Sequence, residues 1–195
     1  MALTLTTRLL PVIASGWHWS FLVGVGINKK TALVAGATGV CGRNLLRELI
    51  AAPDWDVIAL SRRIPDVEGD YHHISVDLMD LPDVKQKLRG LEEVTQIFYS
   101  AYIEKPNWSE MVSPNMNMLV NLMDVVEPAA TNLAHVNIME GTKWYGSHLG
   151  PFKTPAKETD LDPIAPNFYH AQQTYIQELQ VNKRWSWSAA RPHSI

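Results

Sequence analysis

The sequence has little cysteine and no run of basic residues, and both absences narrow the range of functions. Cys41 is the only cysteine among 195 residues, so no disulfide can form within the chain, and a reducing compartment such as the cytoplasm is expected. The 17 Lys and Arg residues and 20 Asp and Glu residues give a net charge of −3. Without a basic stretch, the chain is not expected to use nucleic acid as its main partner.

Charge is also absent near the N-terminus. Residues 9–27 contain no Asp, Glu, Lys or Arg, and Trp17, Trp19 and Phe21 add to their apolar character. A membrane anchor or a cleaved signal peptide is therefore one interpretation of this stretch. Against that interpretation, one proline and three glycines interrupt the stretch, and only Arg8 supplies a positive flank. We expect residues 1–28 to form a poorly ordered extension and expect no membrane partner.

A glycine-rich turn follows this extension and organises the rest of the chain. Residues 31–35 have the length and composition of a buried parallel strand, and a helical pattern of leucines begins after the turn and ends before Pro53. Between them, Gly36 permits a tight turn, Gly39 lets the backbone approach a pyrophosphate, and Gly42 lets helix and strand pack closely. The spacing is Gly-x-x-Gly-x-x-Gly, which is weak evidence without this strand–turn–helix context.

Arginines at the end of the next strand favour one dinucleotide over another. Residues 57–60 complete a strand–helix–strand unit, and an NAD-binding protein usually carries Asp or Glu directly after this strand. This chain instead reads Ser61-Arg62-Arg63, and two guanidinium groups with a hydroxyl suit a ribose phosphate. The pattern therefore favours NADP(H) over NAD(H), with ordinary solvated loop arginines as the alternative interpretation.

The alternation of strands and helices predicts an α/β fold with a doubly wound parallel sheet, Rossmann-like, over residues 29–195. Further strands are expected at 72–76, 94–100, 133–139 and 185–191, and further helices at 80–88, 113–127 and 166–180. Such sheets bind ligands at the carboxyl ends of their strands. The expected cofactor-binding residues are Gly36, Thr38, Gly39, Val40, Gly42, Ser61, Arg62, Arg63, Asp77, Leu78, Ser100, Ala101 and Tyr102.

The Tyr-x-x-x-Lys pair of ordinary short-chain dehydrogenases is missing. In that pair the lysine lies one helical turn after the tyrosine and lowers the pKa of the phenol. Tyr169 has Gln173 in the lysine position, and no other tyrosine has a lysine four residues later. A lysine from another loop could supply the charge, and Lys143, directly after the fifth strand, is the best placed.

Seven short segments together resemble the progesterone 5β-reductase and iridoid synthase family, whose members are atypical extended short-chain dehydrogenases. Gly-Thr-Lys-Trp-Tyr-Gly at 141–146 and Asn-Phe-Tyr at 167–169 are the most selective of them. The others are AGATGVCG (35–42), ALSRR (59–63), VDL (76–78), QIFYS (96–100) and WSAARP (187–192). The resemblance extends from about residue 29 to the last residue.

The resemblance implies NADPH-dependent reduction of the carbon–carbon double bond of an enone or enal. The family's catalytic lysine and tyrosine correspond to Lys143 and Tyr169. Hydride would reach the β-carbon, Tyr169 would donate a hydrogen bond to the enolate oxygen, and Lys143 would stabilise its charge or polarise the phenol. Without the resemblance, a surface lysine and an aromatic residue packed on the sheet would be the simpler interpretation.

Two departures from the family pattern leave alternatives open. Met-Glu-Gly at 139–141 replaces the frequent Gln-Thr-Gly, so Glu140 adds a carboxylate near the expected site. The family also continues beyond residues that match Ile195 into a substrate-covering domain, which we expect this chain to lack. The alternatives are an NADP-binding module with little or no catalysis, and an extended-type carbonyl reductase, epimerase or dehydratase. The natural substrate and the choice between a monomer and a homo-oligomer stay open.

Overall fold

The computed structural model contains a six-stranded, fully parallel sheet in the order β3-β2-β1-β4-β5-β6, which confirms the doubly wound Rossmann-like fold. It describes residues 29–160 and 166–193, so the predicted extension at 1–28 lies outside the described residues. The strands are β1 Lys30–Ala35, β2 Trp55–Ser61, β3 His72–Ser75, β4 Gln96–Tyr99, β5 His135–Met139 and β6 Ser186–Ala190.

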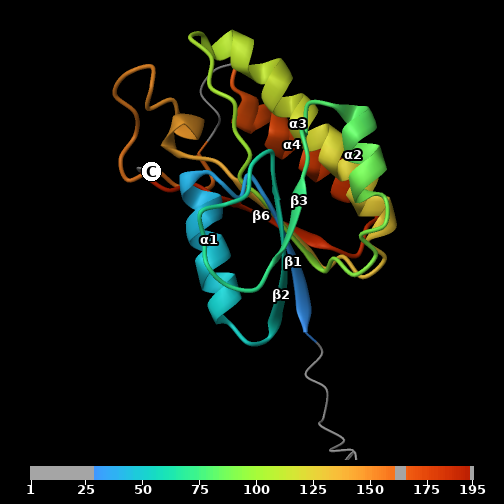
Figure 1. Cartoon of the computed structure of the whole chain (residues 1–195). Coiled ribbons are helices and arrows are strands. Elements are labelled where there is room, and N and C mark those ends of the chain that lie inside the picture. Colours follow the sequence, from blue (N-terminus) through green and yellow to red (C-terminus); the bar gives the residue numbers. More distant parts are fainter. Residues whose placement is uncertain (1–28, 161–165, 194–195) are drawn as a thin grey trace, which may run out of the picture.

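Helices cover both faces of this sheet unequally (Figure 1). The helices are α1 Val40–Ala51, α2 Leu81–Leu88, α3 Trp108–Ala129 and α4 Phe168–Gln180, with a short 3-10 helix η1 at Thr142–Tyr145. Alternate residues of β1 point to opposite faces, so Ala32 and Val34 join the core under α1, whereas Leu33 and Ala35 join the larger core under α2, α3 and α4. None of the helices in the two described ranges is long and apolar enough to cross a membrane.

Helix α3 differs from its predicted bounds. The Ser-Pro pair at 113–114 predicted its start and Pro128 its stop, but both prolines lie inside a helix that runs from Trp108 to Ala129. Met111, which is 2% exposed, extends the buried face of the helix back to its first turn. Tertiary packing therefore overrides the local proline signal. Of the methionines in the middle of α3, Met116 is half-buried and Met118 is buried in the core.

Asn115 is a fully buried polar residue that connects α3 to the segment after β4. Its Nδ2 donates to the carbonyl oxygens of Ile103 and Met111, both at 2.8 Å, and its Oδ1 accepts from the Ile103 N–H at 2.9 Å. Because both backbone groups of Ile103 are held in this way, the preceding residue, Tyr102, has a defined place at the carboxyl edge of the sheet.

We expect Asn115→Ala to lower the free energy of unfolding by about 2–4 kcal/mol, because buried backbone groups lose their partners. Urea denaturation of the purified chain measures this loss. Asn117→Ala, at an exposed position of the same helix, is the matched control and should change stability by less than about 0.5 kcal/mol. Equal midpoints for the two variants would show that Asn115 does not hold the segment.

Candidate functional site

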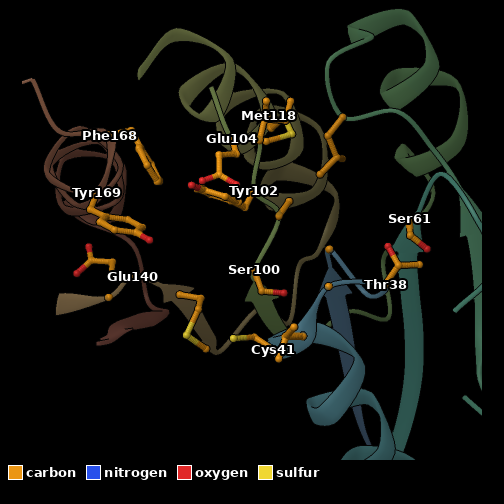
Figure 2. A pocket seen from close by; sticks show the side chains of 18 of the residues that line it. Thr38, Cys41, Ser61, Ser100, Tyr102, Glu104, Met118, Glu140, Phe168 and Tyr169 are labelled. Carbon is orange, nitrogen blue, oxygen red and sulfur yellow. The ribbon is translucent and has the colours of Figure 1, made fainter. Parts of the chain in front are cut away.

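A cavity of about 680 Å³ runs along the carboxyl edge of the sheet, from the ends of β2 and β3 to the ends of β5 and β6 (Figure 2). Its middle lies where β1 and β4 are neighbours, the point at which the strand order reverses and open α/β sheets bind ligands. Of the predicted site residues, those lining it are Gly36, Thr38, Gly39, Val40, Ser61, Arg62, Asp77, Leu78, Ser100, Ala101, Tyr102, Lys143 and Tyr169. Gly42 and Arg63 do not line it.

The glycine turn is packed against the end of β4, and this packing explains two of its three glycines. Gly36 has a φ of +81°, and a Cβ there would lie 2.6 Å from the backbone nitrogen of Ala101. A Cβ on Gly42 would lie 2.3 Å from the Gly36 carbonyl oxygen and 2.9 Å from Ser100 Oγ. Gly42 therefore serves close packing behind the cavity wall, as its predicted role implies.

Gly39 differs from the other two glycines because the surrounding protein restricts a side chain there much less. A Cβ there would meet a single neighbour, the Gly36 carbonyl oxygen at 3.3 Å, and Gly39 itself lines the cavity. Gly39 is the N-cap of α1, which has neither a side-chain cap nor an acidic residue in its first turn. The first N–H groups of α1 are thus left for an anion, so this cradle fits the pyrophosphate of a dinucleotide.

The residues after β2 and β3 form one end of the cavity. Ser61 Oγ donates to the Arg63 carbonyl oxygen at 2.6 Å, and Ser75 Oγ donates to the Arg62 carbonyl oxygen at 3.1 Å. These bonds hold the backbone of the arginine pair while both side chains stay exposed. Ser61 therefore shapes the loop with its hydroxyl, and the guanidinium groups are available to a ligand.

Tyr169 and Lys143 lie at the opposite end, where the chain leaves β5 and enters α4. The Tyr169 hydroxyl points into the cavity (Figure 2) and has no hydrogen-bond partner among residues 29–160 and 166–193. Burial raises the pKa of Tyr169 to about 12, and the charges of Tyr102 and Glu140 add to this. Tyr169 is therefore a neutral phenol at ordinary pH, able to donate a hydrogen bond.

Lys143 reaches the same end of the cavity from η1, but its ammonium group is not bonded to the phenol. Its Nζ lies 5.1 Å from the centre of the Trp108 ring, a cation–π contact. Asn167 Nδ2 donates to the Lys143 carbonyl oxygen at 2.9 Å, and Asn167 Oδ1 accepts from the Tyr169 N–H at 3.0 Å. Asn167 thus connects the backbones of the two predicted catalytic residues, which lie 26 positions apart in the sequence.

Several cavity residues were not predicted from the sequence. Phe168 packs against Tyr169, with ring centres 4.2 Å apart, and Glu140 was noted only as a departure from a family pattern. The unpredicted lining residues include Met79, Ile103, Glu104, Met118, Met139, Gly141, Thr142, Phe168, Pro192 and His193. Gly141, Thr142 and Pro192 come directly after predicted strands, and this position could have identified them as cavity residues. Met118 lies in the middle of α3, where the sequence carries no such signal.

Comparison with known proteins gives a family match over most of the chain. The family model for the PRISE-like Rossmann-fold domain matches residues 32–195. The 3-oxo-Delta(4,5)-steroid 5-beta-reductase of Arabidopsis thaliana is 30% identical over 207 residues, covering 92% of this chain and 52% of that protein. The (S)-8-oxocitronellyl enol synthase of Catharanthus roseus is 32% identical over 205 residues, covering 90% and 51%. The chain spans about half the length of the curated relatives it matches.

Solved structures share the fold at low sequence identity. UDP-glucose 4-epimerase from Bifidobacterium longum, in complex with NAD+ and UDP, superposes with a TM-score of 0.69 at 16% identity, covering 83% of this chain and 52% of that one. A short-chain dehydrogenase/reductase superfamily protein from Agrobacterium tumefaciens with bound NAD gives 0.67 at 16% identity, covering 83% and 48%.

We expect Gly42→Ala to lower the free energy of unfolding by about 1–3 kcal/mol, because a Cβ at this position collides with backbone that has no room to move. Thermal or urea unfolding measures the change. Gly90→Ala is the matched control, since no atom lies within 4 Å of a Cβ there. If the two variants unfold at the same midpoint, the turn is not packed against β4 as described.

Proposed function

Because the chain belongs to the family of PRISE-like Rossmann-fold domains, we propose that it binds NADP(H) and supports reduction of the carbon–carbon double bond of a small enone or enal. The names of two relatives describe such chemistry, a 3-oxo-Delta(4,5)-steroid reduced at its 5-beta position and an enol as the product of a synthase. In both, a carbonyl oxygen next to the double bond would gain negative charge during the reaction.

The observation that supports this proposal most directly is the unpartnered phenol of Tyr169. Its pKa, raised to about 12 chiefly by burial, makes it a hydrogen-bond donor and a poor base. A substrate carbonyl placed at this hydroxyl gains a donor whose interaction strengthens as the oxygen becomes an enolate. The bound cofactor would supply the hydride, and water would supply the proton that completes the saturated product.

Lys143 would add positive charge to the same end of the cavity. Its ammonium group lies over Trp108, whose ring centre is 6.4 Å from that of Tyr169. From this position it would favour an anionic oxygen beside Tyr169 through space, without bonding to the phenol itself. This arrangement differs from the Tyr-x-x-x-Lys pair, in which the lysine acts on the tyrosine from the same helix.

The preference for NADP(H) rests on Arg62 and Arg63. Their backbone is held by Ser61 and Ser75, and their side chains extend from the end of β2 toward solvent. Guanidinium groups bind phosphate through paired, charge-assisted hydrogen bonds.

The proposed location of the chain is the cytoplasm, because its single cysteine, Cys41, suits a reducing compartment.

A binding module without turnover is the second candidate, because the chain spans only about half the length of its relatives. Following NADPH absorbance with 2-cyclohexen-1-one or a linear enal separates the two. Saturated ketone or aldehyde as the product supports alkene reduction. NADPH binding without any oxidation would support the module, and an allylic alcohol as the only product would indicate carbonyl reduction.

We expect the double variant Arg62→Ala and Arg63→Ala to weaken NADPH binding by more than about tenfold while changing NADH binding by less than about threefold. Titrating each cofactor against the intrinsic fluorescence of the chain measures both affinities. Arg89→Ala, an exposed arginine outside the cavity, is the matched control. Equal losses for NADPH and NADH would place the extra phosphate elsewhere.

We expect Tyr169→Phe to lower kcat by about 100-fold and to leave the NADPH dissociation constant within about twofold, because the lost hydrogen bond is needed mainly in the transition state. Steady-state kinetics and cofactor titration check the two parts. Tyr175→Phe, on the same helix but bonded to Asp124 at 3.1 Å and outside the cavity, controls for loss of a hydroxyl. Full turnover in Tyr169→Phe would exclude the phenol from the reaction.

A further inference from the structure

Glu140 and Arg191 form a buried ion pair next to Tyr169. Glu140 follows β5, its side chain is fully buried, and Arg191 Nε donates to its Oε2 at 2.6 Å. Figure 2 shows the Glu140 carboxylate beside the Tyr169 ring and away from the phenol hydroxyl. The pair therefore lies at the Tyr169 end of the cavity, with the Glu140 carboxylate away from the phenol hydroxyl.

Arg191 uses its whole guanidinium group to join three parts of the site. Besides the Glu140 bond, Nη1 donates to the Tyr145 hydroxyl at 3.1 Å and Nη2 donates to Gln173 Oε1 at 2.6 Å. The guanidinium carbon also lies 3.7 Å from the centre of the Trp144 ring. Arg191, which follows β6, is thus bonded to the residue after β5, to η1 and to α4.

The bond to Gln173 connects this cluster to the catalytic tyrosine. Gln173 lies four residues after Tyr169, so the two side chains share one face of α4. This is the position at which a Tyr-x-x-x-Lys helix carries its lysine. Here the positive charge at that position comes from Arg191, which follows β6, and Glu140 compensates it.

The second carboxylate oxygen of Glu140 lacks a partner. Oε1 is buried and accepts no hydrogen bond from the part of the chain that the structure describes. Burial raises the pKa of Glu140 to about 7, although the hydrogen bond and charge of Arg191 act in the opposite direction. The carboxyl group is therefore expected to exchange between its charged and neutral forms near neutral pH.

We infer that Glu140 is a positioning residue, which fixes Arg191 against α4 and, through the charge it carries, sets how strongly the phenol of Tyr169 stabilises an anionic oxygen. This inference rests on the proposed reduction for its kinetic part. Its structural part, the fixing of Arg191 against α4 at Gln173, is independent of any turnover.

The charged and titratable groups around Glu140 determine the sign of the effect. Arg191 faces it from the end of β6, Tyr145 from η1 through Arg191, and Tyr169 from α4. The Glu140 charge raises the pKa of Tyr169, so it opposes negative charge in the site. Protonation of Glu140 leaves the positive charge of Arg191 uncompensated, and this charge favours an enolate in the site. Because the pKa of Glu140 is about 7, turnover should rise as the pH falls through about 7.

The experiment compares three variants across pH 6 to 8.5. Glu140→Gln keeps an acceptor for Arg191 and removes the charge, so its turnover should equal or exceed that of the natural chain at high pH and lose the rise toward low pH. Glu140→Leu removes the acceptor and should lower turnover at least tenfold. Glu127→Leu is the matched control, since Glu127 accepts from Trp185 and Lys183 outside the cavity and its loss should leave the pH profile unchanged.

Two measurements test the inference even if the chain shows no turnover. Glu140→Leu should speed amide hydrogen exchange around Gln173 in α4 at least tenfold, whereas Glu140→Gln and Glu127→Leu should not. The natural chain should also lose stability to urea relative to Glu140→Gln as the pH rises from 5 to 8, because a raised carboxyl pKa stabilises the fold only while the group is protonated. Unchanged exchange in a folded Glu140→Leu, or parallel urea midpoints in the natural chain and Glu140→Gln, would overturn the inference. If Glu140→Leu does not fold, the comparison of urea midpoints between the natural chain and Glu140→Gln decides whether the inference holds.

Discussion

The packing of the glycine turn against the end of β4 is the constraint on which the site depends. Gly36 and Gly42 are in contact with Ser100 and Ala101 so closely that no side chain fits between them. This contact sets α1 against the middle of the sheet. The first N–H groups of α1 have no side-chain cap, and its first residues line the cavity. Ser61 and Arg62 at the end of β2 and Tyr169 at the start of α4 then line opposite ends of one cavity, and Figure 2 shows Ser61 and Tyr169 at these two ends. A dinucleotide bound to α1 would therefore extend toward both.

The environment of Tyr169 differs from that of the tyrosine in a Tyr-x-x-x-Lys pair. Burial and the nearby Glu140 charge raise the pKa of its phenol, and no lysine is bonded to it among the described residues. A neutral phenol suits a reaction in which charge develops on an oxygen that must be stabilised, and it suits proton abstraction poorly. The environment of Tyr169 thus favours enolate stabilisation over the acid–base chemistry of a paired tyrosine.

The sequence predicted the parts of the site that depend on local pattern. The glycine turn and the strands around it follow from spacing within about 30 residues, a distance over which strand, turn and helix signals are reliable. Of the arginine pair, which was predicted in the same way, Arg62 lines the cavity and Arg63 does not. The Glu140–Arg191 pair joins positions 51 residues apart, and the contact of Lys143 with Trp108 depends on how η1 lies over α3. Such contacts follow from tertiary packing, which also moved the start of α3 ahead of its proline signal.

If the oxygen of a substrate carbonyl lies at Tyr169, hydride should reach the carbon β to that carbonyl. The decisive measurement incubates the chain with an enone and NADPH that is deuterated at the transferable position of the nicotinamide ring, and then locates the label by NMR. The expected product is a saturated ketone with deuterium on the β-carbon. Deuterium on a carbinol carbon, or no transfer to an enone from NADPH that is demonstrably bound, would contradict it.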